Sequence, residues 1–167
     1  MKPMIFTLVG QDQPGLISNL AQTVYDMGGN WLGSNLSHMA GHFAGFVHID
    51  LPEAKHAKLI KLFSEHPILK IHLLPGHTVE TIDQRNAKIE IMGNDRSGIV
   101  QDLTQILNQF NVNIIKFDSS CESAPNWGGL LFKATAIIST TVDFDLDRLR
   151  EGLEAIANDL MVDIECQ

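Results

Sequence analysis

Two glycine-rich loops hold the residue types best suited to binding chemistry. They have the sequences Gly10-Gln-Asp-Gln-Pro-Gly15 and Gly93-Asn-Asp-Arg-Ser-Gly98. Glycines let the backbone turn sharply, an aspartate can cap a helix, and Pro14 suits the first helical position. Free N–H groups at a helix start, together with the helix dipole, favour a carboxylate or a phosphate. The same loops would also serve as plain helix starts, and the motif leaves both interpretations open.

Each loop lies between an expected strand and an expected amphipathic helix. The strands are predicted at residues 4–9 and 87–92 from short apolar runs that end before the glycines. The helices are predicted from apolar residues at helical spacing. These residues are Leu16, Ile17, Leu20, Ala21, Val24 and Met27 in the first, and Ile99, Val100, Leu103, Ile106, Leu107 and Phe110 in the second.

The remaining elements repeat in the same order. Strands are expected at 30–39 and 42–51 around Ala40-Gly41, then a helix, then a strand at 68–74. The second copy has strands at 113–121 and 130–139, a helix, and a strand at 162–166. The expected helix faces are Ala57, Ile60 and Phe63, and Leu146, Leu149, Leu153, Ile156, Ala157 and Leu160. The order βαββαβ, twice, predicts an α+β fold of antiparallel sheets with helices on one face.

The two copies align at an offset of 83 residues. This offset pairs Gly10 with Gly93, and it holds until an insertion at 122–129, after which the register is expected to resume at Phe46 and Phe132. A length of 167 residues suits one domain or two, but a long period present twice indicates tandem domains. We expect a first domain at 1–76, a linker at 77–86 and a second domain at 87–167.

The composition excludes several classes of protein. The chain is 44% hydrophobic, which excludes disorder, and its formal net charge is −8. Neither half is basic, with −2 over residues 1–84 and −6 over 85–167, so direct binding to nucleic acid is disfavoured. Two distant cysteines, no run of 18 apolar residues and no signal segment predict a cytoplasmic protein.

The first loop motif, the apolar helix after it and the Gly-x-Asn at the next strand resemble the ACT domain, an amino-acid-sensing module of ferredoxin-like fold. The resemblance occurs in both copies, which together cover nearly the whole chain. It implies a site at interfaces between such domains, where loop N–H groups bind a carboxylate, and an aspartate and an asparagine bind the ammonium. The implied residues are Asp12, Pro14, Gly15, Leu16 and Asn30, and at matching positions Asp95, Ser97, Gly98, Ile99 and Asn113.

The segment 123–134, Ser-Ala-Pro-Asn-Trp-Gly-Gly-Leu-Leu-Phe-Lys-Ala, resembles one subfamily. These are tandem-ACT regulators similar to the glycine cleavage system transcriptional repressor. The resemblance implies a non-catalytic homodimer that binds a small amino acid of the glycine or serine class and contacts a DNA-binding activator, without binding nucleic acid itself. We expect no cofactor and no metal. The alternative is an allosteric regulatory subunit of an amino-acid metabolic enzyme.

Other residues suggest weaker hypotheses. All seven histidines fall in the first half, but His38 and His42 lack a recurring metal-ligand spacing, so we expect ordinary surface histidines. The segment 42–49 superficially resembles an RNA-binding strand, but its half of the chain has no arginine. No nucleophile with a partnering base is evident. Trp127, in the insertion, is expected to pack in a domain or partner interface.

Overall fold

The computed structural model describes residues 1–76, 84–123 and 128–166. It divides into two compact units, Met1–Val79 and Glu80–Gln167. The expected linker therefore lies mostly outside the described residues, and its last three residues, 84–86, belong to a strand. The expected interface contact of Trp127 also lies outside the described residues.

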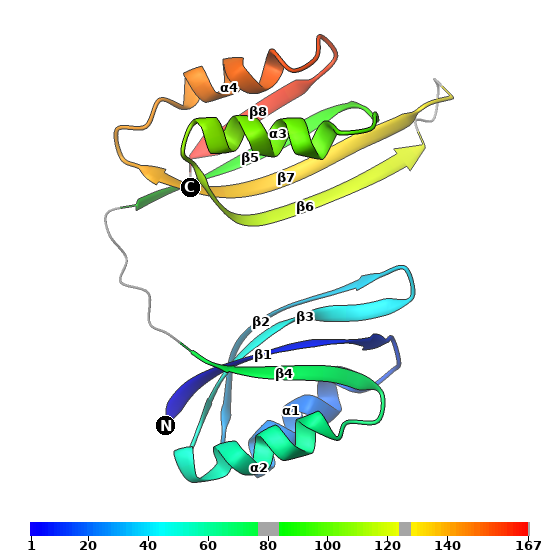
Figure 1. The fold of residues 1–167 in the computed structure, drawn as a ribbon, viewed down its shortest axis with the longest axis vertical. Helices are drawn as coiled ribbons and strands as arrows, with labels where there is room; N and C mark the ends of the chain where they lie inside the picture. The colour runs from blue at the N-terminus through cyan, green and yellow to red at the C-terminus, as the bar shows by residue number, and fades with distance from the viewer. Residues whose placement is uncertain (77–83, 124–127, 167) are drawn as a thin grey trace. The chain divides into compact units, whose positions relative to one another are not determined.

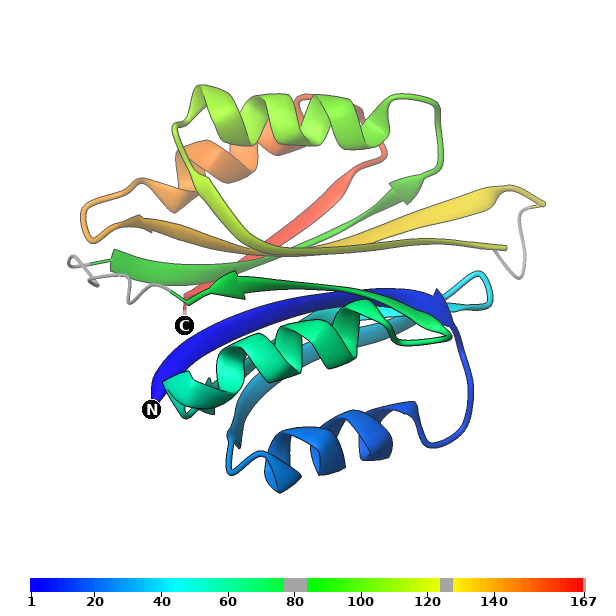
Figure 2. The ribbon, with the colours of Figure 1, turned by 60° about the horizontal axis from the view of Figure 1, so that its bottom comes forward.

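The first unit is a four-stranded antiparallel sheet with two helices on one face (Figure 1, Figure 2). The strand order is β2-β3-β1-β4. The elements are β1 Lys2–Gln11, α1 Leu16–Asp26, β2 Asn30–Met39, β3 His42–Leu51, α2 Glu53–Ser64 and β4 Leu69–Pro75. Both strands of the β2–β3 hairpin have the predicted bounds.

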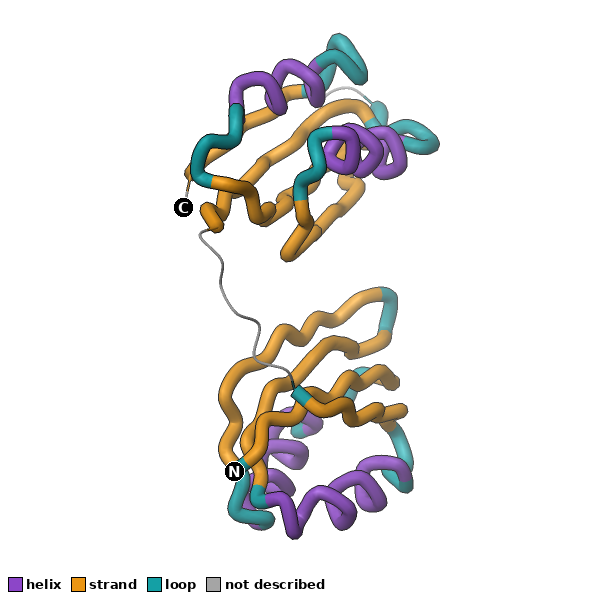
Figure 3. Tube along the Cα trace, turned by 60° about the vertical axis from the view of Figure 1, so that its left-hand side comes forward, coloured by secondary structure: helices purple, strands orange, loops and turns teal. Residues whose placement is uncertain are grey.

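The second unit repeats this order, and Figure 3 shows its helices on one side of the strands. Its sheet order is β6-β7-β5-β8. The elements are β5 Gln84–Asn94, α3 Ile99–Gln109, β6 Asn113–Ser123, β7 Leu130–Thr141, α4 Leu146–Glu154 and β8 Met161–Cys166. The predicted α+β fold of two tandem ferredoxin-like βαββαβ units is confirmed.

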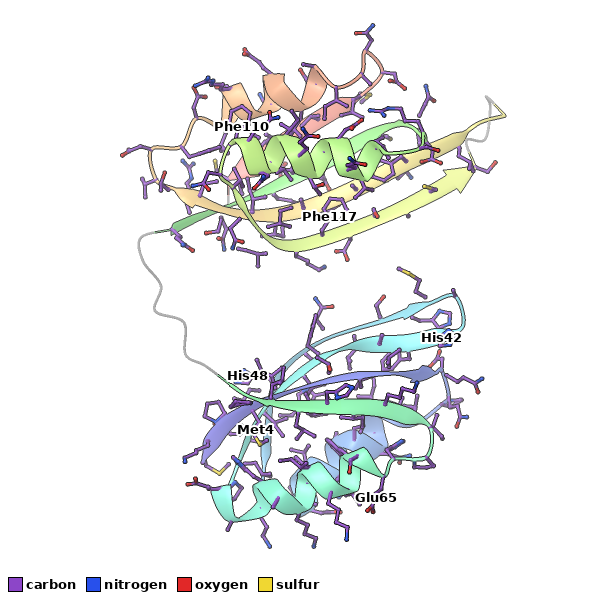
Figure 4. All side chains as sticks on the ribbon, in the orientation of Figure 1. Met4, His42, His48, Glu65, Phe110 and Phe117 are labelled. Carbon is purple, nitrogen blue, oxygen red and sulfur yellow. The ribbon has the colours of Figure 1, made fainter. Side chains whose placement is uncertain are left out.

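Each unit has its own hydrophobic core between its sheet and its helices. Alternate residues of the central strands point into it, as Phe6 does in β1 and Ile89 in β5, both 0% exposed. Figure 4 shows Met4 on this helix-facing side and Phe117 below α3. In the described part of the chain, every helix is too short or too polar to cross a lipid bilayer.

Two predicted helix faces differ from the structure. In α2 the buried residues are Leu59 and Phe63, whereas Ala57 and Ile60 are exposed. His56 lies one turn before Leu59 and is part-buried, with its Nε2 3.1 Å from the Leu51 carbonyl oxygen. Helix α4 ends at Glu154, and the residues 155–160 that continue its apolar spacing form turns whose side chains still pack on the core.

The register after the insertion also differs from the prediction. Gly10 pairs with Phe43, and the equivalent Gly93 pairs with Phe132. Phe43 is therefore the counterpart of Phe132, at an offset of 89 residues. The predicted match of Phe46 with Phe132 is wrong, because Phe46 lies on the other face of its strand and is 59% exposed.

Candidate functional site

The first loop forms a tight turn directly before α1. The Leu16 N–H donates to the Gln13 carbonyl oxygen at 3.4 Å, and Gly15 has φ 88° and ψ −1°. These angles fit the third position of a type II turn, with Pro14 at the second, where proline is favoured. Pro14 thus precedes the helix instead of opening it, which corrects the expectation for its position.

The second loop makes the same turn before α3. The Ile99 N–H donates to the Arg96 carbonyl oxygen at 3.3 Å, and Gly98 has φ 85° and ψ 0°. Ser97 takes the place of the proline. Both glycines occupy the left-handed region that side chains disfavour, so the turn itself explains why each loop has glycine there.

The aspartates do not cap the helices, contrary to expectation. Neither α1 nor α3 has a side-chain hydrogen bond at its N-cap. Instead, the Asp12 N–H donates to the Gly41 carbonyl oxygen at 3.3 Å, and the Asp95 N–H donates to the Leu130 carbonyl oxygen at 2.8 Å. Because the first N–H groups of a helix have no acceptor within it, the uncapped helix starts leave donors for a ligand.

A depression of about 290 Å³ lies at the start of α1. Its floor includes the buried Leu16, whereas Asp12 and Gly15 are exposed. The depression is lined by Asp12, Gln13, Gly15, Leu16, Ile17, Ser18 and Phe43. Asp12, Gly15 and Leu16 are among the residues expected from the sequence, whereas Phe43 is not. Phe43 reaches the loop because β3 pairs with β1. Backbone N–H groups here can bind an anion, and Asp12 can bind a cation.

Within the part of the chain that the structure describes, His38 is the ionisable partner of Asp12. Its Nε2 lies 4.0 Å from the Asp12 Oδ2, and both side chains are about half exposed. The sequence predicts an ordinary surface histidine at position 38, because this pairing joins β2 to the first loop across 26 residues and leaves no local pattern. A protonated His38 would offset the negative charge that Asp12 presents to an incoming carboxylate.

The second loop has different charges around it. Arg96 makes a 2.7 Å ion pair with Asp102 in the first turn of α3. Cys121 takes the place of His38 and lies near Asp95. Desolvation, a hydrogen bond with Asp95 and the charge of that carboxylate raise the pKa of the Cys121 thiol.

Within each unit, the structure separates the implied asparagines from the loops. Asn30 pairs with Asp50, which pairs with Pro3 at the start of β1, whereas the loop follows the far end of β1. Eight residues of strand span roughly 25 Å. Asn113 pairs with Ser139 at the corresponding end of the second sheet. The remaining implied residues gather at their loops: Asp12, Pro14, Gly15 and Leu16, and Asp95, Ser97, Gly98 and Ile99.

Two histidines lie within hydrogen-bond distance of backbone groups a few residues away. His66 Nδ1 accepts from the Leu69 N–H at 3.0 Å, and His42 Nδ1 lies 3.1 Å from the Ala40 carbonyl oxygen. Across the described residues, no group of three or more histidines, cysteines and acids is placed to hold a metal ion.

Comparison with known proteins points to one family. The model of the ACT domain matches residues 2–67. No curated protein matches the sequence. Several solved structures match over almost the whole chain, including two with TM-scores above 0.5. An unknown protein from Galdieria sulphuraria is 23% identical, with 99% of this chain and 98% of that chain covered and a TM-score of 0.85.

The second structure is of a protein named as a candidate glycine cleavage system transcriptional repressor. It is 17% identical, with 99% of this chain and 97% of that chain covered and a TM-score of 0.63. These likenesses establish the fold of both units, and the family model identifies the first. Residues 2–67 of the chain therefore match the ACT domain, and a second unit of the same ferredoxin-like fold follows them.

Proposed function

We propose that this protein is an amino-acid-responsive regulator of glycine cleavage. It binds a small amino acid of the glycine or serine class and acts as a cytoplasmic homodimer. Through a DNA-binding transcriptional activator, it affects transcription without contacting DNA. The observation that carries this proposal is the uncapped start of α1 beside the depression of about 290 Å³, within an ACT domain.

The first loop offers complementary groups for both ends of an amino acid. Backbone N–H groups of the first turn, near Ile17 and Ser18, suit the carboxylate. The exposed Asp12 carboxylate suits the ammonium group. Phe43 and Leu16 supply apolar surface beside these groups. The second loop has the equivalent residues Asp95, Ser97, Gly98 and Ile99, and we propose it as the second site.

Binding suits these residues better than catalysis. Ser18 supplies the hydroxyl of the depression, and the described lining residues include no histidine or lysine that could act as its base. A serine nucleophile needs such a base. The net charge of −8 opposes direct contact with DNA phosphates, which is why a protein partner is proposed for the regulatory step.

The alternative partner is an amino-acid metabolic enzyme that this chain would regulate as a subunit. Both alternatives use the same ligand-binding unit, so ligand binding does not distinguish them. Immobilised protein should retain a purified transcriptional activator of glycine-cleavage genes with an affinity that glycine changes. Retention of a biosynthetic enzyme instead, with a change in its turnover, would favour the subunit.

Thermal unfolding in the presence of single amino acids tests the ligand. An amino acid at about 100 times its dissociation constant stabilises the folded state by roughly 2.7 kcal/mol. We expect a selective rise in melting temperature with glycine or serine, and a loss of that rise in Asp12→Ala. If no amino acid raises the melting temperature, the proposed sensor function is wrong.

A further inference from the structure

The face of the first sheet opposite α1 and α2 combines exposed apolar side chains with histidines. Val9, Phe46 and Leu74 lie on it and are 43%, 59% and 55% exposed. His48 lies opposite Ile5 of β1, and His72 lies opposite Thr7. Figure 4 shows His42 and His48 on this side of the sheet. We call this surface, formed by the outward residues of β1–β4, face 1.

Face 1 has few acidic side chains beside its histidines and its lysine. Lys70 of β4 lies opposite Val9 of β1. Ala44 of β3 and Ser37 of β2 continue this row across the sheet. Within the described residues its carboxylate is Asp50, at the end next to Pro3. The centre of face 1 therefore offers donors and an aromatic side chain.

The equivalent face of the second sheet, which we call face 2, is acidic. Glu90 and Asp163 lie directly opposite each other on β5 and β8. Like charges in that arrangement destabilise a sheet unless a cation joins them. Lys88 pairs with Glu90 at 2.6 Å, but in the described chain no ion pair includes Asp163.

Face 2 is also hollowed. A depression of about 450 Å³ is lined by Glu90, Met92, Lys133, Thr135, Met161 and Asp163. Met92 and Met161 lie directly opposite each other, and Met161 is 64% exposed. Lys133 is held by Glu122 at 2.7 Å. The lining of the hollow thus combines two thioethers with the Asp163 carboxylate.

We propose that face 1 of one copy docks on face 2 of a second copy. Phe46 of the first copy enters the hollow beside Met92 and Met161, where thioether–aromatic contacts are favourable. The imidazoles and Lys70 of face 1 lie against the acidic row that contains Asp163. Charge argues for this pairing, since Lys70 and the histidines of face 1 meet a face on which Glu90 and Asp163 lie side by side. The depression of face 2 offers space for the exposed Phe46.

Because each copy has one face of each kind, two reciprocal contacts close a dimer of twofold symmetry. Four strands about 4.8 Å apart and roughly eight residues long give a face on the order of 500 Å². Two such contacts would bury about 2,000 Å² in all, which is within the range of stable complexes. This inference rests on the homodimer of the proposed function and names its surface.

Sedimentation velocity of the full chain, without amino acid, tests the pairing. Phe46→Glu alters face 1, and Asp163→Lys alters face 2. Matched controls are Tyr25→Glu on α1, where the side chain is 74% exposed, and Glu154→Lys at the end of α4. Circular dichroism checks that each variant is folded. We expect a dimer for the wild type and both controls, and at least a tenfold weaker dimer for each face variant.

Mixing the two face variants separates this pairing from others. Phe46→Glu keeps face 2 intact and Asp163→Lys keeps face 1 intact, so an equimolar mixture should form a heterodimer through one good contact. A monomeric wild type overturns the proposal. A dimer that Phe46→Glu breaks and Asp163→Lys spares indicates pairing of face 1 with itself, which also overturns it. A dimer unaffected by either variant keeps the proposed homodimer and rejects these faces.

Discussion

His38 of β2 and Cys121 of β6 occupy the same place in the two units. His38 lies opposite Phe43 and Cys121 opposite Phe132, and each is next to the aspartate of its own loop. The first pair can become an ion pair when the imidazole is protonated, whereas a thiol beside a carboxylate cannot. The two loops therefore share their backbone turn but differ in the charge that a carboxylate ligand would meet.

The Asp95–Cys121 pair predicts a thiol of low reactivity. Desolvation and the Asp95 carboxylate raise the pKa of Cys121, so less thiolate is present at a given pH. In a Cys166→Ser background, Asp95→Asn should speed alkylation of Cys121 by iodoacetamide several-fold at mildly alkaline pH. Asp143→Asn, which changes an exposed acid elsewhere, is the control. Equal rates in Asp95→Asn and the parent would show that the carboxylate does not restrain the thiol.

Asp159 should make the second unit sensitive to acid. The Asn94 N–H donates to its Oδ2 at 3.1 Å, and this hydrogen bond lowers the pKa of Asp159. A lowered folded pKa adds stability above the unfolded value of about 4, and that stability is lost as the pH falls through the folded value. Asp159→Ala should lower the melting temperature at pH 7, and the difference from wild type should narrow below about pH 4.

The same series in Asp143→Ala provides the control for Asp159. Melting curves from pH 7 to pH 2.5 should show little dependence on this second substitution. A difference between Asp159→Ala and wild type that stays constant with pH would mean that packing, and not the charge, accounts for the loss.

A substitution in the β2–β3 turn should raise the stability of the protein. Ala40 and Gly41 have φ 49° and 79°, as in the two-residue type I′ turn that favours Asn-Gly. A left-handed alanine costs about 1 kcal/mol. Ala40→Asn should raise the free energy of unfolding by about 0.5–1 kcal/mol in urea titration. Ala40→Val should lower it, and stabilisation by both substitutions would contradict the strain argument.

Substitution of Gly15 should strain the backbone of the first loop without causing a steric clash. A Cβ there meets nothing within 4 Å, but φ is 88°. Gly15→Ala should cost about 1 kcal/mol of unfolding free energy from backbone strain and reduce the response to amino acids. The control is Gly33→Ala, where space is also open and φ is not in the left-handed region. A full ligand response in Gly15→Ala would reject the first loop as the site.

Local patterns predicted most of the fold. Ala40-Gly41 marks the β2–β3 turn because the two-residue hairpin needs positive φ at both positions. The α2 face was not predictable from apolar spacing, since a histidine, His56, takes the place of an apolar residue one turn before Leu59. Beyond Glu154, turns bury apolar side chains at spacings that imitate a continued helix.

The site was predictable only in part. The Pro14-Gly15 turn follows from local chemistry, because glycine at the third position and proline at the second favour a type II turn. Phe43 was missed because its contact with the loop depends on how β3 pairs with β1, and no local sequence pattern gives that register. Asn30 is far from the loop because it follows the C-terminal end of α1, and the loop precedes the other end.

The position of β1 has a consequence for biosynthesis. It lies in the centre of its sheet, between β3 and β4. The ribosome synthesises β1 before the other strands of the unit, but β1 completes its hydrogen bonding only after β4 has been synthesised. Once Pro75 has left the ribosome, the first unit has every strand its sheet requires and a core of its own. It can then fold while residues 84–166 are still being translated, which keeps two similar sheets from exchanging strands as the chain grows.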